Sequence, residues 1–166
     1  SEGRGLIRVC DEEAAWRVSS MRVQTGAELY LQEYIPHGGF DVRILVLGGQ
    51  VLAAMRRRHP SDWRTNLARG AAAEPVTLTD EEAALAVRAA AMLEVDFAGV
   101  DVLQRPCGER VVIEVNAVPG WQGISQLTGM DVARKFLEWM YSGSSCPGKP
   151  EAAGGMTGKG RTRGAE

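Results

Sequence analysis

Residues 97–116 read FAGVDVLQRPCGERVVIEVN and are central to the fold, because they predict an antiparallel hairpin. Residues 97–103 and 110–116 are rich in strand-forming residues, and Pro106-Cys107-Gly108 supplies the turn between them. A second hairpin is predicted over residues 41–57, because Gly48-Gly49 is a strong two-residue turn signal between apolar runs. The two hairpins indicate an antiparallel sheet.

Helices are predicted around this sheet over residues 12–24, 80–93 and 131–141. Asp11 suits the N-cap of the first, and Thr79 with acidic residues after it opens the second. The first helix is expected to turn Ala15, Val18 and Met21 inward. The last helix is expected to carry its apolar residues on one face, namely Val132, Phe136, Leu137 and Met140. Further strands are predicted at 6–9 and 28–34, and 59–78 is predicted to be a loop. Hairpins with helices inserted between them predict the α+β class, an antiparallel sheet with helices packed on it.

Composition excludes several classes of protein. The chain has 166 residues, of which 45% are hydrophobic and 24% charged, which is typical of a globular domain. Its net charge of −2 argues against a nucleic-acid partner bound by bulk charge. No apolar run approaches the roughly 18–20 residues that span a bilayer, so no membrane partner is expected. Three irregularly spaced cysteines favour a reducing, cytoplasmic location.

The two ends of the chain differ from its middle. The chain does not begin with Met and opens on a glycine-rich stretch, so we expect an N-terminally truncated sequence. Gly, Ser, Lys, Pro and Ala dominate from residue 142 onward and periodicity stops. The sequence therefore predicts a partial domain at 1–141 and a disordered tail at 142–166.

Three oxygen-bearing side chains lie on the strands of the 97–116 hairpin. Asp101 interrupts an apolar run, and Glu114 and Asn116 are two residues apart, which places them on one face of a strand. If the two strands pair, all three can share a face. Two carboxylates and an amide oxygen suit Mg²⁺ or Mn²⁺. The alternative is a solvated polar sheet face that holds no ion.

Arginines are concentrated on the other hairpin and after it. Arg43 follows Asp41 at the i, i+2 spacing, Arg56-Arg57-Arg58 ends the partner strand, and Arg64 lies in the loop beyond. Guanidinium groups bind phosphate and carboxylate oxygens well. An arginine cluster that faced a metal would form a phosphoryl-transfer site. Each arginine alone could equally be an exposed strand end.

Seven short motifs follow one another along residues 1–141: Ser1-Glu2-Gly3-Arg4-Gly5, Leu31-Gln32-Glu33-Tyr34-Ile35, Phe40-Asp41-Val42-Arg43, Arg57-Arg58, Trp63-Arg64-Thr65-Asn66-Leu67, Ala98-Gly99-Val100-Asp101 and Glu114-Val115-Asn116-Ala117-Val118-Pro119-Gly120. In this order and spacing they resemble the RimK-like branch of the ATP-grasp ligases. The resemblance implies the ATP-grasp fold and ATP with Mg²⁺ or Mn²⁺ as cofactors.

The resemblance also implies a role for each motif. The glycine-rich loop is implied to cover the ATP phosphates with Ser1, Gly3 and Gly5. The hinge is implied to bind the nucleotide with Gln32, Glu33 and Tyr34, of which Glu33 and Tyr34 contact adenine. Further ATP contacts are implied at Asp41, near the ribose, and at Arg64, Thr65 and Asn66. Metal ligation is implied for Asp101, Glu114 and Asn116. Arg43, Arg57 and Arg58 are the implied catalytic residues, which steady the phosphate and an acyl phosphate.

The reaction that the resemblance implies is ATP-dependent joining of an amine to a carboxylate through an acyl phosphate. The amine is glutamate or a similar amino acid, and the acceptor is a protein tail, a peptide or a small molecule. Relatives commonly form homo-oligomers. They also carry two phosphate-contacting lysines and an N-terminal substrate domain upstream, which this sequence does not include. The alternatives are a catalytically incomplete nucleotide- and metal-binding fragment and an α+β interaction module with a solvated acidic strand pair.

Overall fold

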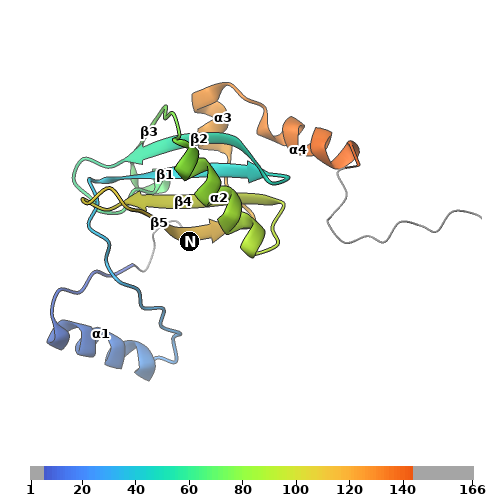
Figure 1. Cartoon of the computed structure of the whole chain (residues 1–166). Helices are drawn as coiled ribbons and strands as arrows, with labels where there is room; N and C mark the ends of the chain where they lie inside the picture. Colours follow the sequence, from blue (N-terminus) through green and yellow to red (C-terminus); the bar gives the residue numbers. More distant parts are fainter. Residues whose placement is uncertain (1–5, 144–166) are drawn as a thin grey trace, which may run out of the picture.

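The computed structural model describes residues 6–143 and centres on a five-stranded antiparallel sheet (Figure 1). The strand order is β3-β2-β1-β4-β5. The strands are β1 (Phe40–Leu47), β2 (Gln50–Arg58), β3 (Ala72–Glu74), β4 (Phe97–Gln104) and β5 (Arg110–Asn116). The helices are α1 (Glu12–Gln24), the 3₁₀ turn η1 (Leu67–Arg69), α2 (Asp80–Met92), α3 (Gln122–Thr128) and α4 (Val132–Tyr141). The predicted α+β class and both predicted hairpins are confirmed.

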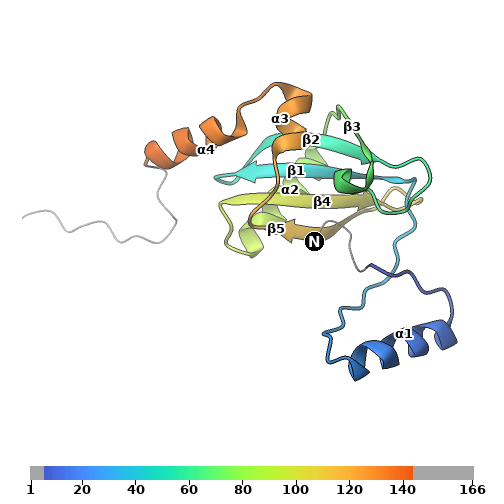
Figure 2. The same ribbon diagram turned by 180° about the vertical axis from the view of Figure 1, so that it is seen from behind.

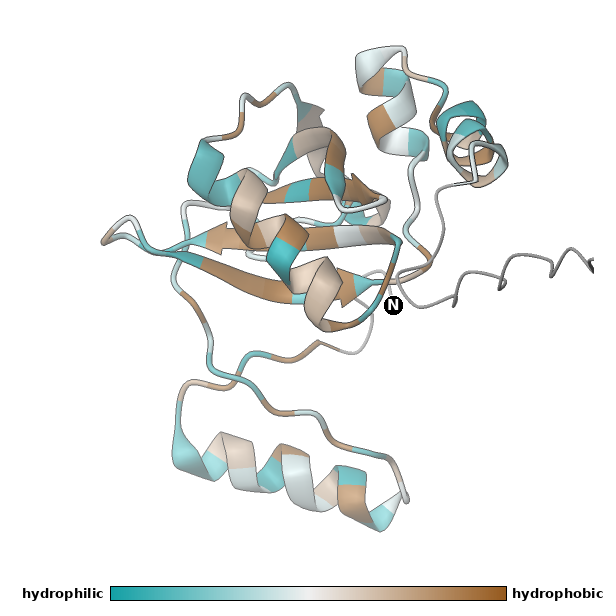
Figure 3. Ribbon diagram, turned by 45° about the vertical axis from the view of Figure 1, so that its right-hand side comes forward, coloured by the Kyte–Doolittle hydropathy of each residue, from teal (hydrophilic) through white to brown (hydrophobic). Residues whose placement is uncertain are grey.

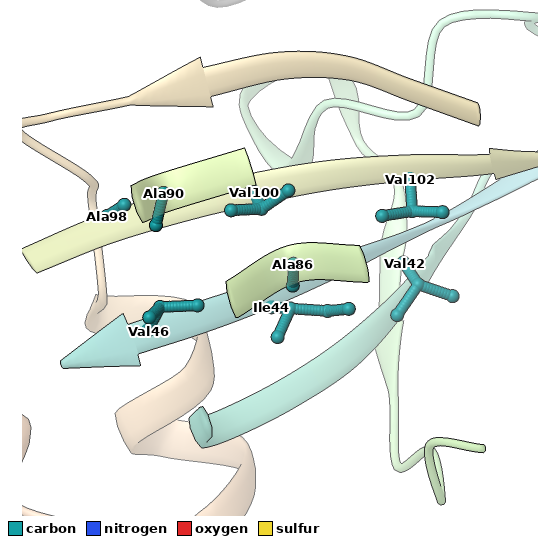
Figure 4. Close-up of a cluster of buried hydrophobic side chains, with 8 residues drawn as sticks. All are labelled: Val42, Ile44, Val46, Ala86, Ala90, Ala98, Val100 and Val102. Atoms are coloured by element: carbon teal, nitrogen blue, oxygen red, sulfur yellow. The ribbon is translucent and has the colours of Figure 1, made fainter. Parts of the chain in front are cut away.

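One face of the sheet is covered by α2 (Figure 1). Figure 4 shows Val42, Ile44 and Val46 of β1 beside Val100 and Val102 of β4, under the small side chains of α2. Alanines at the contact, Ala86 and Ala90, let the helix approach the sheet closely. The helix begins with a capping box, in which the Thr79 hydroxyl accepts from the Glu82 N–H and the Glu82 carboxylate accepts from the Thr79 N–H.

The opposite face is covered in part by α3, as the view from behind shows (Figure 2). Ile124 of α3 and Val132 of α4 are buried with Leu45 and Met55 of the sheet. The sequence predicts a loop where α3 forms, because its seven residues QGISQLT follow Trp121, which provides no side-chain cap. This helix depends on packing against the sheet rather than on its own end signals.

The chain beyond α3 is held at the β1–β2 turn. Gly48 has a φ of +56°, and a Cβ there would lie 2.3 Å from the indole nitrogen of Trp139 on α4. On the same helix, Phe136 stacks on Phe97 of β4 with ring centroids 5.1 Å apart. Leu137 and Met140, expected on the apolar face of this helix, are instead 51% and 57% exposed.

The N-terminal quarter departs from the sequence prediction. Residues 6–9 and 28–34 are irregular rather than strands, because no described strand lies beside them to supply the hydrogen bonds of a ladder. The predicted helix forms as α1, yet it has no buried residue, so Ala15, Val18 and Met21 are not turned into a core. Figures 1 and 3 show α1 apart from the sheet, with its apolar residues spread along it.

The remaining predictions concern the loops and the ends of the chain. Residues 59–78 are largely a loop, as predicted, but include η1 and the short strand β3. The boundary predicted after residue 141 stays a prediction, and the tail from residue 144 onward lies outside the described residues. Cys10 and Cys107 are free thiols. Within residues 6–143, no helix combines the length and the apolar character that crossing a bilayer requires.

Candidate active site

Four charged side chains meet on the sheet face opposite α2. The valines and isoleucine of β1 and β4 at the alternate positions are buried under α2, so Asp41, Arg43 and Asp101 project from the other face. The register places Asp41 opposite Arg57 of β2 and Arg43 opposite Asp101 of β4. Each acid is therefore beside a base on the neighbouring strand.

Asp101 accepts hydrogen bonds from two guanidinium groups. Arg43 binds it with two parallel contacts, Nε to Oδ1 and Nη2 to Oδ2, both 2.8 Å. Nη2 of Arg57 lies 2.8 Å from the same Oδ2. Arg57 also binds Asp41 with two contacts: its Nε lies 2.8 Å from Oδ1, and its Nη2 bonds Oδ2. We call these four residues, Asp41, Arg43, Arg57 and Asp101, the charge cluster.

Burial shapes the electrostatics of the charge cluster. The side chains of Asp101 and Arg57 are 2% and 4% exposed, whereas that of Arg43 is 13% exposed. Burial raises the pKa of Asp41 and outweighs the opposing effect of Arg57. Burial alone would lower the pKa of Arg57, but its hydrogen bond to Asp41 and the negative charges of Asp101 and Asp41 raise that pKa above its usual value. Both oxygens of Asp41 accept from a guanidinium, so we assign the pair as ionised and the cluster as neutral in sum.

The two other residues predicted as metal ligands lie on β5. Glu114 is the register partner of Asp101 and is exposed, and Asn116 is the partner of Gly99. The Asn116 side-chain oxygen accepts a hydrogen bond from the Val118 N–H at 3.0 Å. In the described part of the chain, no group of three or more His, Cys, Asp or Glu side chains could hold a metal ion. A metal here would therefore depend on the amide oxygen of Asn116 or on oxygens of the substrate.

Arg58 does not join the charge cluster. It follows Arg57 directly, so its side chain leaves the opposite face of β2, where it lies 3.3 Å from Glu74 and over the Phe40 ring. Arg56 lies over the same ring. The structure thus separates Arg57 and Arg58, which the family resemblance implies act at one site.

The predicted adenine hinge lies in the irregular segment before β1. Gln32 is exposed, and Glu33 lies 3.3 Å from two nitrogens of Arg105 on the β4–β5 turn. Tyr34 packs edge-on against Trp63 with centroids 6.0 Å apart. That contact brings the hinge next to the loop that carries Arg64, so two motifs 30 residues apart in sequence lie side by side.

The loop after β2 holds the remaining predicted nucleotide residues. Asp62 accepts from Arg64 Nη2 at 2.9 Å, and this contact holds the pKa of Asp62 well below its usual range. Thr65 is buried beside Asp41, where its side chain partly opposes the rise in the pKa of Asp41 that burial causes. Asn66 precedes η1 at its N-cap position. Ser1, Gly3 and Gly5 of the predicted phosphate loop lie outside the described residues.

A comparison with protein-family models decides the assignment: the model described as the RimK-like ATP-grasp domain matches residues 1–140. The chain belongs to the RimK-like ATP-grasp family. The predicted family is confirmed.

Two curated relatives of this RimK-like chain are about twice its length. The chain is 41% identical over 152 residues to the "probable alpha-L-glutamate ligase" of Aeromonas salmonicida strain A449. The matched residues make up 90% of this chain and 51% of the relative. The chain is 39% identical over 142 residues to the ribosomal protein bS6–L-glutamate ligase of Escherichia coli O81 strain ED1a, with 84% of this chain and 47% of the relative covered. The chain spans about half the length of these relatives.

Solved structures support the ATP-grasp fold. The ATP-grasp ligase PsnB, complexed with a minimal precursor, Mg and ADP, matches with a TM-score of 0.63 at 23% identity and covers 86% of this chain and 45% of that one. The D-alanine–D-alanine ligase of Bacillus anthracis, complexed with ATP, matches with a TM-score of 0.60 at 21% identity and covers 82% and 47%. At these identities the likeness establishes the fold alone.

Two residues that contact the predicted nucleotide-binding segments of this RimK-like chain have no marked signal in the sequence. Arg105 contacts Glu33, 72 positions away, and no local pattern marks such a pair. His59 bonds the loop residues Asp62 and Arg69. His59 stands directly before Pro60-Ser61-Asp62, a turn-forming run, and this was the one signal that could have singled it out.

Proposed function

We propose that this RimK-like chain provides the metal- and nucleotide-binding part of an ATP-dependent carboxylate–amine ligase. One observation carries the proposal: Asp101 and Glu114 are cross-strand partners, on the sheet face where Arg43 and Arg57 converge. A pair of carboxylates beside a pair of guanidinium groups suits a metal and the phosphate oxygens that the metal binds.

The donor chemistry of this face fits a divalent cation. Glu114 supplies a carboxylate oxygen and Asn116 an amide oxygen, both hard donors of the kind that Mg²⁺ and Mn²⁺ prefer. Asp101 would contribute its carboxylate from within the charge cluster, where Arg43 and Arg57 bind both of its oxygens. Glu114 is exposed, so its carboxylate is accessible to an ion that also binds the phosphates of ATP. When bound, the ion would neutralise charge on the phosphate oxygens.

The two arginines of the charge cluster have different tasks. Arg43 is the more exposed, 13% against 4% for Arg57, so we assign it to contact the transferred phosphoryl group. Arg57 is buried between Asp41 and Asp101 and fixes the Asp101 carboxylate. Arg58 lies on the other face and takes no part in this assignment. Asp41 is bound on both oxygens by Arg57, so it supports that arginine rather than the ribose.

Nucleotide binding is assigned to the two motifs that meet at the Tyr34–Trp63 contact. Glu33 and Tyr34 would hold the adenine, and Arg64, Thr65 and Asn66 would approach the rest of the nucleotide. Their common location, next to the charge cluster through Thr65 and Asp41, supports this assignment.

The proposed reaction has two steps and needs no protein nucleophile. A substrate carboxylate oxygen attacks the γ-phosphorus of ATP, ADP leaves, and an acyl phosphate forms. The amine nitrogen then attacks the acyl carbon, phosphate leaves with the C–O electron pair, and the nitrogen loses a proton to give the amide. Arg43 faces the negative charge that gathers on the transferred oxygens. The names of the relatives favour glutamate as the amine and a protein tail as the acceptor.

Titration calorimetry of the chain with Mg·ADP, Mg·ATP and metal-free ADP tests the proposal. We expect heat from ADP with Mg²⁺ and little without it, and we expect Glu114→Gln to abolish the difference. The exposed Arg88→Gln on α2, on the far face of the sheet, is the matched control. Equal ADP affinity with and without Mg²⁺ would contradict the proposal.

A second candidate is a binding module that holds nucleotide and metal without forming amides. It is favoured by the ion pairs of the charge cluster, because Arg43 and Arg57 both bind carboxylates rather than being free to contact a phosphoryl group. Release of ADP from ATP in the presence of glutamate and peptides with acidic tails separates the two. Metal-dependent binding without ADP release supports the binding module.

A further inference from the structure

His59 joins the two ends of the loop that follows β2. Its ring nitrogen Nδ1 accepts a hydrogen bond from the Asp62 N–H at 2.8 Å and a longer one from the Ser61 N–H at 3.3 Å. Its other nitrogen, Nε2, lies 3.3 Å from the carbonyl oxygen of Arg69. The loop enclosed by these contacts carries Arg64-Thr65-Asn66.

These contacts are chemically consistent with only one neutral form of the ring. A nitrogen that accepts from a backbone N–H must present a lone pair, so Nδ1 carries no proton. The proton is then on Nε2, which can donate to the Arg69 carbonyl, a group that only accepts. One ring thus satisfies a donor near the start of the loop and an acceptor near its end.

The anchored loop in turn orders Arg64. Asp62, whose N–H is held by the ring, accepts from the Arg64 N–H at 2.9 Å and from its Nη2 at 2.9 Å. The same carboxylate lies 3.5 Å from Arg69 Nε. His59 is itself tied to the segment before β1, because its N–H donates to the Gly39 carbonyl at 3.0 Å.

We propose that His59 is a positioning residue for the nucleotide-binding loop, acting through the Asp62 backbone to fix Arg64. The role rests on the proposed function, because it assigns this loop to nucleotide. His59 itself does not contact the nucleotide. The ring lies outside both apolar clusters of the core, so its loss loosens the loop without unfolding the sheet.

Two variants of His59 distinguish the effect of its hydrogen bonds from the effect of its side-chain volume. In His59→Asn, the side-chain oxygen sits as many bonds from Cα as Nδ1 does and can accept from the Asp62 N–H. In His59→Leu, the volume is kept but the acceptor is lost. Ser61→Ala is the matched control, because Ser61 contributes only its backbone N–H to the ring.

The first readout needs no ligand. The chain has two histidines, so nitrogen NMR with His37→Asn for assignment reports the His59 tautomer directly. In the parent chain we expect the proton on Nε2 of His59 and slow hydrogen exchange of the Asp62 amide. The slow exchange should be retained in Ser61→Ala and in His59→Asn and lost in His59→Leu. A proton on Nδ1, or unchanged Asp62 exchange in His59→Leu, would overturn the proposal.

The second readout is Mg·ADP affinity by calorimetry. Loss of one or two hydrogen bonds corresponds to a weakening of about 5- to 30-fold in His59→Leu, and His59→Asn should remain within about threefold of the parent chain. Parent affinity in His59→Leu, or loss of its global melting transition, would contradict a positioning role. No binding of Mg·ADP by the parent chain would instead contradict the proposed function, while the tautomer and exchange data still decide whether His59 anchors the loop.

Discussion

Asp41 and Arg57 face each other across the β1–β2 hairpin and form an ion pair that is almost completely removed from water. Asp101 on β4 shares the same guanidinium, so the pair also links the hairpin to the strand of the proposed metal site. In a buried setting, each charge tolerates its loss of solvent only while its partners remain. The stability of the sheet and the geometry of the site therefore depend on the same side chains.

Arg57→Met should destabilise the chain far more than Arg58→Met. Removing Arg57 leaves Asp41 buried without its guanidinium partner, which costs about 3–5 kcal/mol, whereas the exposed pair of Arg58 with Glu74 is worth about 0–1 kcal/mol. Urea unfolding of both variants measures the difference. Equal losses would mean that the Asp41–Arg57 pair is not buried in solution.

Glu114→Gln should remove metal-dependent nucleotide binding at little cost in stability, because Glu114 is exposed. Asp101→Asn should remove the same binding and also lower stability, by about 3–5 kcal/mol, because two guanidinium groups lose a buried anion. Calorimetry with Mg·ADP and thermal melting of both variants provide the comparison. Unchanged Mg²⁺ dependence in both would contradict the assigned ligands.

Arg43→Gln should weaken Mg·ATP binding by about tenfold or more and leave adenosine binding unchanged, because a charged hydrogen bond is worth about 1.5–3 kcal/mol. The reason is the position of Arg43, which is the more exposed base of the charge cluster. Parallel titrations with ATP and adenosine measure the split. Equal losses for the two ligands would mark Arg43 as structural.

Gly48→Ala should destabilise the contact between the β1–β2 turn and α4. The residue has a φ of +56°, which disfavours a side chain, and the added Cβ would meet the indole of Trp139 at 2.3 Å. We expect a loss of about 1–3 kcal/mol, of the size that overpacking produces, together with a change in Trp fluorescence. Gly49→Ala, where a Cβ would meet nothing within 4 Å, is the control for the backbone effect.

The free energy of unfolding should fall in acid, because protonation of Glu82 removes its charged hydrogen bonds with Thr79 and Arg110. Burial raises the pKa of this carboxyl, but its hydrogen bonds with Thr79 and Arg110 outweigh burial and lower the pKa below 4.5. A lowered pKa means that the stabilisation is present above the usual Glu value and is lost as the pH falls through the lower folded value. Glu82→Gln should cost about 0.5–2 kcal/mol at pH 7. The difference between the two chains should shrink below pH ~4, and a constant difference down to pH ~2 would contradict the assignment.

Local chemistry explains which elements could be predicted. The β1–β2 hairpin and α2 carry their own end signals, Gly48-Gly49 and the Thr79–Glu82 capping box, so they follow from sequence. Segments 6–9 and 28–34 have strand composition but no described neighbour to pair with, and composition cannot supply a partner. The short helix α3 was missed for the opposite reason, since packing of Ile124 under the sheet supports it.

The sequence by itself determined the donor types of the site and their spacing: Asp101, the Glu114–Asn116 pair and the arginines of β1 and β2. Only the tertiary structure decided that Asp101 lies between Arg43 and Arg57, and that Arg58 lies on the far face. The reason is register. Burial of Val42, Ile44 and Val100 under α2 fixes which face each strand turns to the core, and every charged neighbour then takes the alternate face.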